Sequence, residues 1–206
     1  MIIAVDGPTA SGKGTIAKAL AAHFGLPHLD TGLLYRAVGR QCERGGGNAD
    51  DPSDALAACD FPDQLLADPE LRSEASGGLA SRVSVHPGVR AALYERQRAF
   101  ATQPGGAVLD GRDIGTVIAP EAGVKLFVVA SIPARAERRF KEMQAAGRTV
   151  SLAVVAADLA ARDQRDRTRT EAPLVAAADA VLLDTSDFSR ESVIAEAIRL
   201  VEAHMN

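Results

Sequence analysis

The sequence predicts a three-layer α/β fold, in which helices cover both faces of a parallel β-sheet. Two observations lead to this prediction. Short apolar runs rich in β-branched residues alternate with helical segments along the 206 residues, as in α/β domains. These runs have no polar side, which is typical of strands in a parallel sheet buried on both faces. The length and the 47% hydrophobic content suit one full core.

The chain opens with a strand followed by a helix. Residues 2–6, IIAVD, form a short apolar run that we expect as a buried strand. Residues 13–25, KGTIAKALAAHFG, are expected as a helix, because Ile16, Leu20 and Phe24 recur at helical spacing and a glycine ends the run. The loop between the two elements then lies at the carboxyl end of the first strand.

Four further strands are expected downstream. The apolar runs are AVLD at 107–110, VKLFVVA at 124–130, AVLLD at 180–184 and, as a weaker candidate, LPHLD at 26–30. The C-terminal segment SRESVIAEAIRLVEA has Val193, Ala197 and Val201 at helical spacing, and Ser189 can serve as the N-cap of this helix.

Two stretches interrupt the alternation of strands and helices. Residues 37–100 contain the flexible GGGNADDPSD and then polar helical segments without a clear strand. Residues 131–170 carry many charges and almost no β-branched run. We interpret both as excursions from one sheet core, and the chain shows no internal repeat. The sequence therefore predicts a single domain.

Composition and charge exclude several classes of function. The net charge of −4 and the pI of about 5.6 disfavour a general nucleic-acid binder, which normally carries a basic surface. No apolar run approaches the ~20 residues that span a bilayer, and no signal sequence is expected. Cys42 and Cys59 lack CxxC spacing, so neither a disulfide framework nor a zinc site is indicated. We expect a cytoplasmic protein that binds neither nucleic acid nor membrane.

The strongest functional signal is GPTASGKGT at residues 7–15, between the first strand and the first helix. It matches the phosphate-binding loop G-x-x-x-x-G-K in its required context. The loop N–H groups and the helix N-terminus bind phosphate oxygens, and Lys13 is expected to reach the β- and γ-phosphates. Gly14 replaces the usual Ser or Thr and Thr15 follows, which favours a small-molecule kinase over a GTPase switch. The expected ATP-binding residues are Gly7, Pro8, Thr9, Ala10, Ser11, Gly12, Lys13, Gly14 and Thr15.

A second segment, VLDGRDIGT at 108–116, lies at the carboxyl end of a predicted strand, where ligands of open α/β sheets bind. Asp110 could organise the water shell of a metal, Arg112 could hold a phosphate, and Asp113 could accept a hydrogen bond from an amino group. The alternative is a tight Asp-Gly turn with a local ion pair.

A third segment is LDTGLLYR at 29–36. Thr31 is expected to begin a helix, with Arg36 inside it and aimed at the same edge as the phosphate loop. A capped amphipathic helix explains the same residues, and the two interpretations are compatible.

Residues 162–169, RDQRDRTR, concentrate positive charge in a mildly acidic chain. One helix face is expected to carry Arg162, Arg165, Asp166 and Arg169. Asp163 and Arg167 are expected to form an i,i+4 surface ion pair on another side. The first face carries more positive charge than one aspartate neutralises. The stretch alone fits either a solvated helix face or a clamp for an anion.

Five segments together resemble the bacterial cytidylate kinase family. They are DGPTASGKGT, LDTGLLYRA, VRAALYERQRAF, LDGRDIGTVI and RDQRDRTR…APL, in this order. The resemblance covers essentially the whole chain, and the third and fifth segments are more specific than the phosphate loop. It implies phosphorylation of CMP and dCMP by ATP with Mg²⁺. It also implies a P-loop NTPase fold with a five-stranded parallel sheet, a nucleotide-monophosphate-binding insertion and a lid.

The resemblance also implies roles for individual residues. The arginines expected to hold the acceptor phosphate are Arg36, Arg112 and Arg169. The pair expected on the ribose and phosphate side is Arg162 and Asp166, and the cytosine is expected to be read by Ser81, Arg90 and Asp113. This suits cytosine, because a carboxylate can accept from its N4 amino group. Thr31, Tyr35 and Asp110 complete the substrate-binding set, and the expected catalytic residues are Lys13, Arg112, Arg162 and Arg169.

The expected partners are ATP and CMP or dCMP, bound by a monomer. Mg²⁺ is expected to arrive with ATP and to be held through nucleotide phosphates and water near Thr15 and Asp110, without protein ligands. Two alternatives remain open from the sequence. One is a kinase for another nucleoside monophosphate, UMP or AMP, and the other is a nucleotide-binding switch without turnover.

The resemblance further implies a division of the single domain. The core is expected at 1–36, 101–138 and 171–206, the acceptor-binding insertion at about 37–100, and the lid at about 139–170. Many relatives carry a small β-rich insertion at a place where this chain has only FPDQLLADPE, between Asp60 and Leu71. The acceptor-binding insertion is therefore expected to be shortened.

Overall fold

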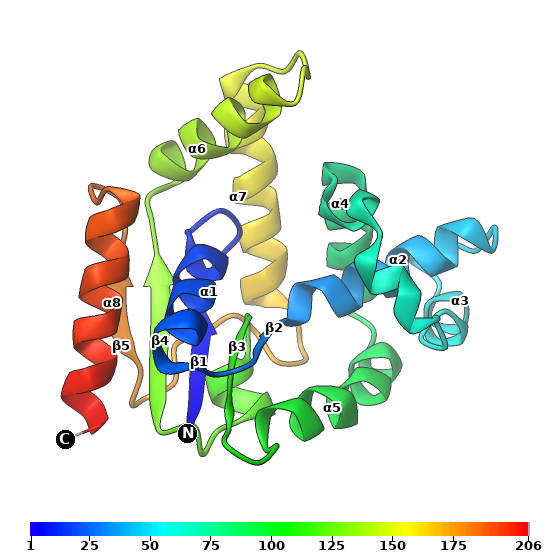
Figure 1. The fold of residues 1–206 in the computed structure, drawn as a ribbon. Helices are drawn as coiled ribbons and strands as arrows, with labels where there is room; N and C mark the ends of the chain where they lie inside the picture. The colour runs from blue at the N-terminus through cyan, green and yellow to red at the C-terminus, as the bar shows by residue number, and fades with distance from the viewer. Residues whose placement is uncertain (206) are drawn as a thin grey trace.

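A sheet of five parallel strands forms the centre of the computed structural model, which describes residues 1–205 (Figure 1). The strands lie in the order β2-β3-β1-β4-β5. They are β1 (Ile2–Asp6), β2 (His28–Asp30), β3 (Ala107–Gly111), β4 (Val124–Val129) and β5 (Val181–Asp184). All five coincide with the apolar runs predicted as strands, although β3 is one residue longer than its run, and the weakest candidate is the shortest strand, β2. The predicted parallel α/β fold is confirmed.

Helices account for most of the remaining described residues. They are α1 (Lys13–Phe24), α2 (Thr31–Arg44), α3 (Pro52–Ala57), α4 (Glu74–Val83), α5 (Pro87–Ala101), α6 (Ile132–Ala145), α7 (Leu152–Thr168) and α8 (Arg190–Met205). Short helical turns lie at η1 (Asp63–Ala67), η2 (Pro69–Arg72) and η3 (Ile114–Ile118). Within residues 1–205, no helix combines the length and the apolar character needed to cross a membrane.

Strand residues alternate between two covered faces of the sheet. Ile3 and Val5 of β1 pack with residues of α1 and α8 on one face. Ala4 points to the other face, where residues of α5 and η3 form a second cluster. Because both faces are buried, the strand sequences show no polar side.

The two predicted helix boundaries are confirmed by their caps. Gly25 ends α1 in the left-handed region with φ of 65°, and its N–H donates to the Ala21 carbonyl oxygen. Ser189 precedes α8, and its Oγ accepts a hydrogen bond from the Ser192 N–H at 3.1 Å. The cap residues therefore fix where both sheet-covering helices start or stop.

The segment between β2 and β3 buries a hydrophobic cluster of its own. Its described residues form helices and turns without a strand, and Leu34, Val38 and Leu71 are fully buried in the cluster. Leu29 of β2 packs against both this cluster and the sheet. The short stretch FPDQLLADPE folds into η1 and η2, and Leu65 anchors it in the cluster. Figure 1 shows α2, α3 and α4 extending away from the sheet.

The helices α6 and α7 are joined by a buried ion pair. Arg135 of α6 donates to Asp163 of α7 at 2.5 and 3.0 Å, and their exposed fractions are 2% and 6%. Arg135 also donates to the carbonyl oxygens of Thr9 at 3.1 Å and Ala130 at 2.9 Å, which ties this pair of helices to the phosphate loop. The predicted surface pair between Asp163 and Arg167 is therefore wrong. Helical spacing did not show that Asp163 turns inward toward α6, whereas Arg167 is exposed.

The buried pair leads to a stability prediction. Asp163→Ala should lower the free energy of unfolding by about 3–5 kcal/mol, because Arg135 would be left buried without a counter-charge. Arg167→Ala, at an exposed position on the same helix, should change it by less than about 0.5 kcal/mol. Urea unfolding of both variants measures the difference. Equal effects would show that the Arg135–Asp163 pair does not hold the two helices together.

Candidate active site

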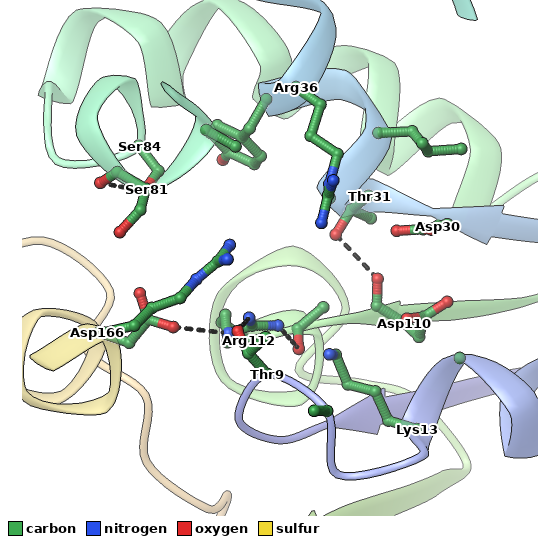
Figure 2. A pocket seen from close by; sticks show the side chains of 18 of the residues that line it. Thr9, Lys13, Asp30, Thr31, Arg36, Ser81, Ser84, Asp110, Arg112 and Asp166 are labelled. Atoms are coloured by element: carbon green, nitrogen blue, oxygen red, sulfur yellow. Dashed lines mark hydrogen bonds and ion pairs between the residues drawn. The ribbon is translucent and has the colours of Figure 1, made fainter. Parts of the chain in front are cut away.

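The segments predicted to bind ligands surround one cavity of about 350 Å³ at the carboxyl ends of the strands (Figure 2). Every predicted substrate-binding residue lines it: Thr31, Tyr35, Arg36, Ser81, Arg90, Asp110, Arg112, Asp113, Arg162, Asp166 and Arg169. From the phosphate loop, the lining residues are Thr9, Ala10, Lys13 and Gly14. The remaining loop residues, Gly7, Pro8, Ser11, Gly12 and Thr15, lie outside this lining.

Close packing at its first glycine fixes the phosphate loop. A Cβ at Gly7 would stand 2.1 Å from the Val128 carbonyl oxygen of β4, so any side chain there would collide with the sheet. Lys13 begins α1 and extends into the cavity (Figure 2), with its Nζ 3.4 Å from the Pro8 carbonyl oxygen. The loop thus presents Lys13 to whatever occupies the cavity.

Arg112 connects the phosphate loop to α7 (Figure 2). Its Nε donates to Asp166 Oδ2 at 2.8 Å, and its Nη2 donates to Thr9 Oγ1 at 2.7 Å. The turn after Arg112 is held in place by Asp6 at the end of β1, which accepts from the N–H groups of Ile114 at 2.9 Å and Gly115 at 2.8 Å. These bonds fix the Arg112 guanidinium in the lining of the cavity.

Two more arginines reach the cavity from opposite helices. Arg36 of α2 donates from Nη1 to the carbonyl oxygens of Leu71 at 2.7 Å and Ser73 at 2.9 Å. Arg162 of α7 has a buried Nε for which the described residues provide no hydrogen-bond partner. A buried donor without a partner is costly unless a ligand accepts from it.

Asp113 lies between two arginines at another part of the cavity. Arg90 of α5 donates to Asp113 Oδ2, and the Arg169 Nη2 lies 3.6 Å from Asp113 Oδ1. The Arg90 guanidinium also stands 5.9 Å above the centre of the Tyr35 ring. Arg169 was predicted on the α7 face, and this was wrong: α7 ends at Thr168, and Arg169 has extended backbone. The chain turns there, which brings Arg169 to Asp113.

Asp110 of β3 is fixed by two neighbours from the β2 side of the sheet. Its Oδ1 is 2.7 Å from His28 Nε2, and its carbonyl oxygen accepts from Thr31 Oγ1 at 2.9 Å. A Cβ at Gly14 would stand 3.6 Å from Asp110 Oδ2, so the missing side chain leaves room between the loop and this carboxylate. Within residues 1–205, no three His, Cys, Asp or Glu side chains gather to hold a metal by themselves.

Residues 3–203 match the family model described as cytidylate kinase. The chain belongs to the cytidylate kinase family. A curated relative named cytidylate kinase, from Azorhizobium caulinodans, is 57% identical over 98% of both chains. A second relative of that name, from Rhodopseudomonas palustris (strain TIE-1), is 54% identical over 98% of this chain and 96% of its own. Membership confirms the predicted enzyme class and the predicted activity, ATP-dependent phosphorylation of CMP.

A solved structure supports the fold independently. The crystal structure of an uncharacterized protein from Eubacterium ventriosum has a TM-score of 0.57 and 14% sequence identity, and it covers 98% of this chain and 99% of its own. Together with the five-stranded parallel sheet, this agrees with the P-loop NTPase fold predicted from the sequence.

In the site of this cytidylate kinase family member, two basic side chains have lowered pKa values. Burial, and next the charge of Arg112, lower the pKa of Lys13 to about 7. The same two causes, burial first, lower the pKa of Arg162 to about 10. Burial alone would raise the pKa of Asp166, but Arg112 holds it below its ordinary value. The cavity is therefore electrostatically prepared for an anion.

Two contacts at or beside the cavity were missed from the sequence. His28 received no role, because its spacing from other histidines fits no metal site, yet it bonds Asp110. Its spacing of two from Asp30 is a usable signal, since both then share a strand face next to β3. Glu74 of α4 and Arg139 of α6 line the cavity and pair with each other. Nothing in the sequence links these two residues, which come from separate helical segments.

The lowered pKa of Lys13 predicts proton uptake on ATP binding. At pH 8 the free protein should hold Lys13 largely neutral, and the phosphates should raise its pKa and protonate it. Titration calorimetry at pH 8, in two buffers of different ionisation enthalpy, measures this uptake. It should be smaller at pH 6, where Lys13 already carries its proton, and absent in Lys13→Met. Uptake that persists in Lys13→Met would assign it to another group.

Proposed function

We propose that the chain transfers the γ-phosphoryl group of ATP to CMP or dCMP in this cavity, and that the arginines of three segments hold the acceptor phosphate. One observation carries the proposal. Arg36, Arg112 and Arg169 line one cavity with Arg162 and Lys13. Within residues 1–205, Arg162 Nε and Arg169 Nη2 are buried without a hydrogen-bond partner. A phosphate group supplies the negative charge that this set lacks, and arginine forks suit phosphate oxygens.

On the donor side, the phosphate loop and Lys13 bind the β- and γ-phosphates. Asp110 and Thr15 are the residues that would hold Mg²⁺ through its water, with the metal itself bound to nucleotide phosphates. Bound there, Mg²⁺ would neutralise charge on those phosphates. Arg112 lies between the two substrates, because it contacts Thr9 of the loop and Asp166 of α7.

The attacking group is a phosphate oxygen of the acceptor that is already ionised, so the chain needs no general base. Lys13, Arg112 and Arg162 would stabilise charge on the transferring group by fixed electrostatic contacts. Arg169 would add a further positive charge from the end of α7. Water must be kept away from the transferring group, because hydrolysis competes with transfer.

Base recognition is proposed for the part of the cavity around Asp113. Its carboxylate would accept from the cytosine N4 amino group, and Arg90 would donate to the ring acceptors. Arg90 is well placed for this, because it is fixed by Asp113 and by the Tyr35 ring. Ser81 lines the same cavity and would complete the contacts.

The proposed division of the chain follows the hydrophobic clusters. The acceptor-binding insertion at about 37–100 matches the cluster between β2 and β3, and the lid at about 139–170 matches the small cluster of α6 and α7. The proposed core comprises 1–36, 101–138 and 171–206. The insertion begins inside α2, so this helix belongs to both parts. A monomeric state and a cytoplasmic location stay predictions.

A coupled assay tests the proposed function. ADP formation from ATP should depend on CMP, and Lys13→Met should reduce turnover on the order of 10²–10³-fold, because one preorganised charge is lost. The thermal midpoint should change little, since the loop backbone remains. The two alternatives, a UMP or AMP kinase and a switch without turnover, are not favoured by the family. Faster turnover of UMP or AMP, or ATP binding without turnover, would reinstate them.

Asp113 should determine the preference for cytosine over uracil. Uracil places an acceptor, O4, where cytosine has its N4 donor, so a carboxylate repels it. We expect Asp113→Asn to narrow the ratio of kcat/KM for CMP to that for UMP. The ratio is the useful measurement, because loss of folded protein affects both substrates equally. An unchanged ratio would assign base recognition to other residues.

A further inference from the structure

One face of α4 meets arginines of the neighbouring helices. Glu74, Gly77 and Ser81 are three and four residues apart, so they share this face. Glu74 accepts from Arg139 Nε at 2.8 Å, and Ser81 Oγ accepts from Arg165 Nε at 3.2 Å. Gly77, between them on this face, has no side chain that could contact an arginine.

Two guanidinium groups occupy the space at Gly77. A Cβ there would stand 3.2 Å from Arg162 Nη1 and 3.2 Å from Arg36 Nη2. The two nitrogens are therefore no further apart than twice that distance. Two oxygens of one phosphate group, each accepting a hydrogen bond of about 2.9 Å from one of these nitrogens, can bridge such a gap. The two arginines come from α7 and α2, and their guanidinium groups meet next to Gly77.

Backbone conformation does not explain this glycine. Gly77 lies inside α4, where alanine would be more favourable by about 1 kcal/mol. Its neighbour Gly78 lies in the same helix, and a Cβ there would meet nothing within 4 Å. Space for the arginines is the feature that separates the two positions.

The two arginines differ in their freedom to move. Arg36 is held by the carbonyl oxygens of Leu71 and Ser73, directly before α4. Arg162 has a buried Nε without a partner in residues 1–205. A methyl group at position 77 would therefore displace Arg162 and leave Arg36 in place.

We propose that Gly77 is a positioning residue for the acceptor phosphate: its missing side chain lets Arg36 and Arg162 approach closely enough to share one phosphate group. This rests on the proposed function of the cavity and adds a residue to it. Gly77 acts through the arginines and does not touch the nucleotide itself. Its substitution should impair use of the acceptor and leave ATP binding on the opposite side unchanged.

The experiment compares Gly77→Ala with Gly78→Ala as a matched control. Both variants gain similar helix propensity, so neither thermal midpoint should fall. Gly77→Ala should lower kcat/KM for CMP by about 10-fold, because a slightly misplaced arginine positions the acceptor less well. Its Kd for ATP should stay unchanged, and Gly78→Ala should match the wild type in kcat/KM for CMP and in Kd for ATP.

A double-mutant cycle separates positioning from packing. In an Arg162→Ala background, Gly77→Ala should have little further effect on kcat/KM for CMP, because the displaced group is gone. Additive effects, a lowered thermal midpoint or weakened ATP binding would overturn the proposal. Equal kcat/KM values for the two glycine variants would also overturn it. Wild-type protein without CMP-dependent ADP formation would refute the proposed function and this inference with it.

Discussion

The structure depends on how the chain pairs its buried arginines, because a buried charge without a partner is costly. Asp113, Asp163 and Asp166 each bond one buried or half-buried arginine. The partner arginines come from α5, from α6 and from the turn after β3. Each pair therefore joins two separate elements of the fold. These three contacts, together with the hydrophobic clusters, fix the helices beyond the sheet relative to the phosphate loop.

The positive charges left over from this pairing define the function. Lys13, Arg36 and Arg162 face the cavity with their charges incompletely neutralised, and burial lowers the pKa of each. The folded protein bears this electrostatic cost in its free state. A bound phosphate neutralises these charges, so part of the binding free energy comes from removing this electrostatic cost. The same groups are then already in place when charge develops during transfer.

Much of the fold and of the site could be predicted from the sequence, because local patterns carry it. Two-sided apolar runs marked the strands, and the glycine spacing marked the phosphate loop. The errors fall where a local pattern states which residues share a face but not what that face meets. Asp163 was placed in a surface pair for this reason, although it is buried against Arg135. His28 and Arg139 were missed because their partners come from other segments.

Because α2 is one unbroken helix, a tilt about its sheet end would move the acceptor side of the cavity as a rigid unit. Its sheet end is fixed where Thr31 bonds the Asp110 carbonyl, and its far end lies in the separate helical cluster (Figure 1). The 14 residues of α2 span about 21 Å, so a tilt of about 10° at the fixed end moves the far end by about 4 Å. The backbone of Arg36 lies little more than one turn from the fixed end of α2, so it would move far less. A tilt of α2 would thus move the outer wall of the cavity far more than the backbone of Arg36, whose guanidinium is bonded to the Leu71 and Ser73 carbonyl oxygens of that wall.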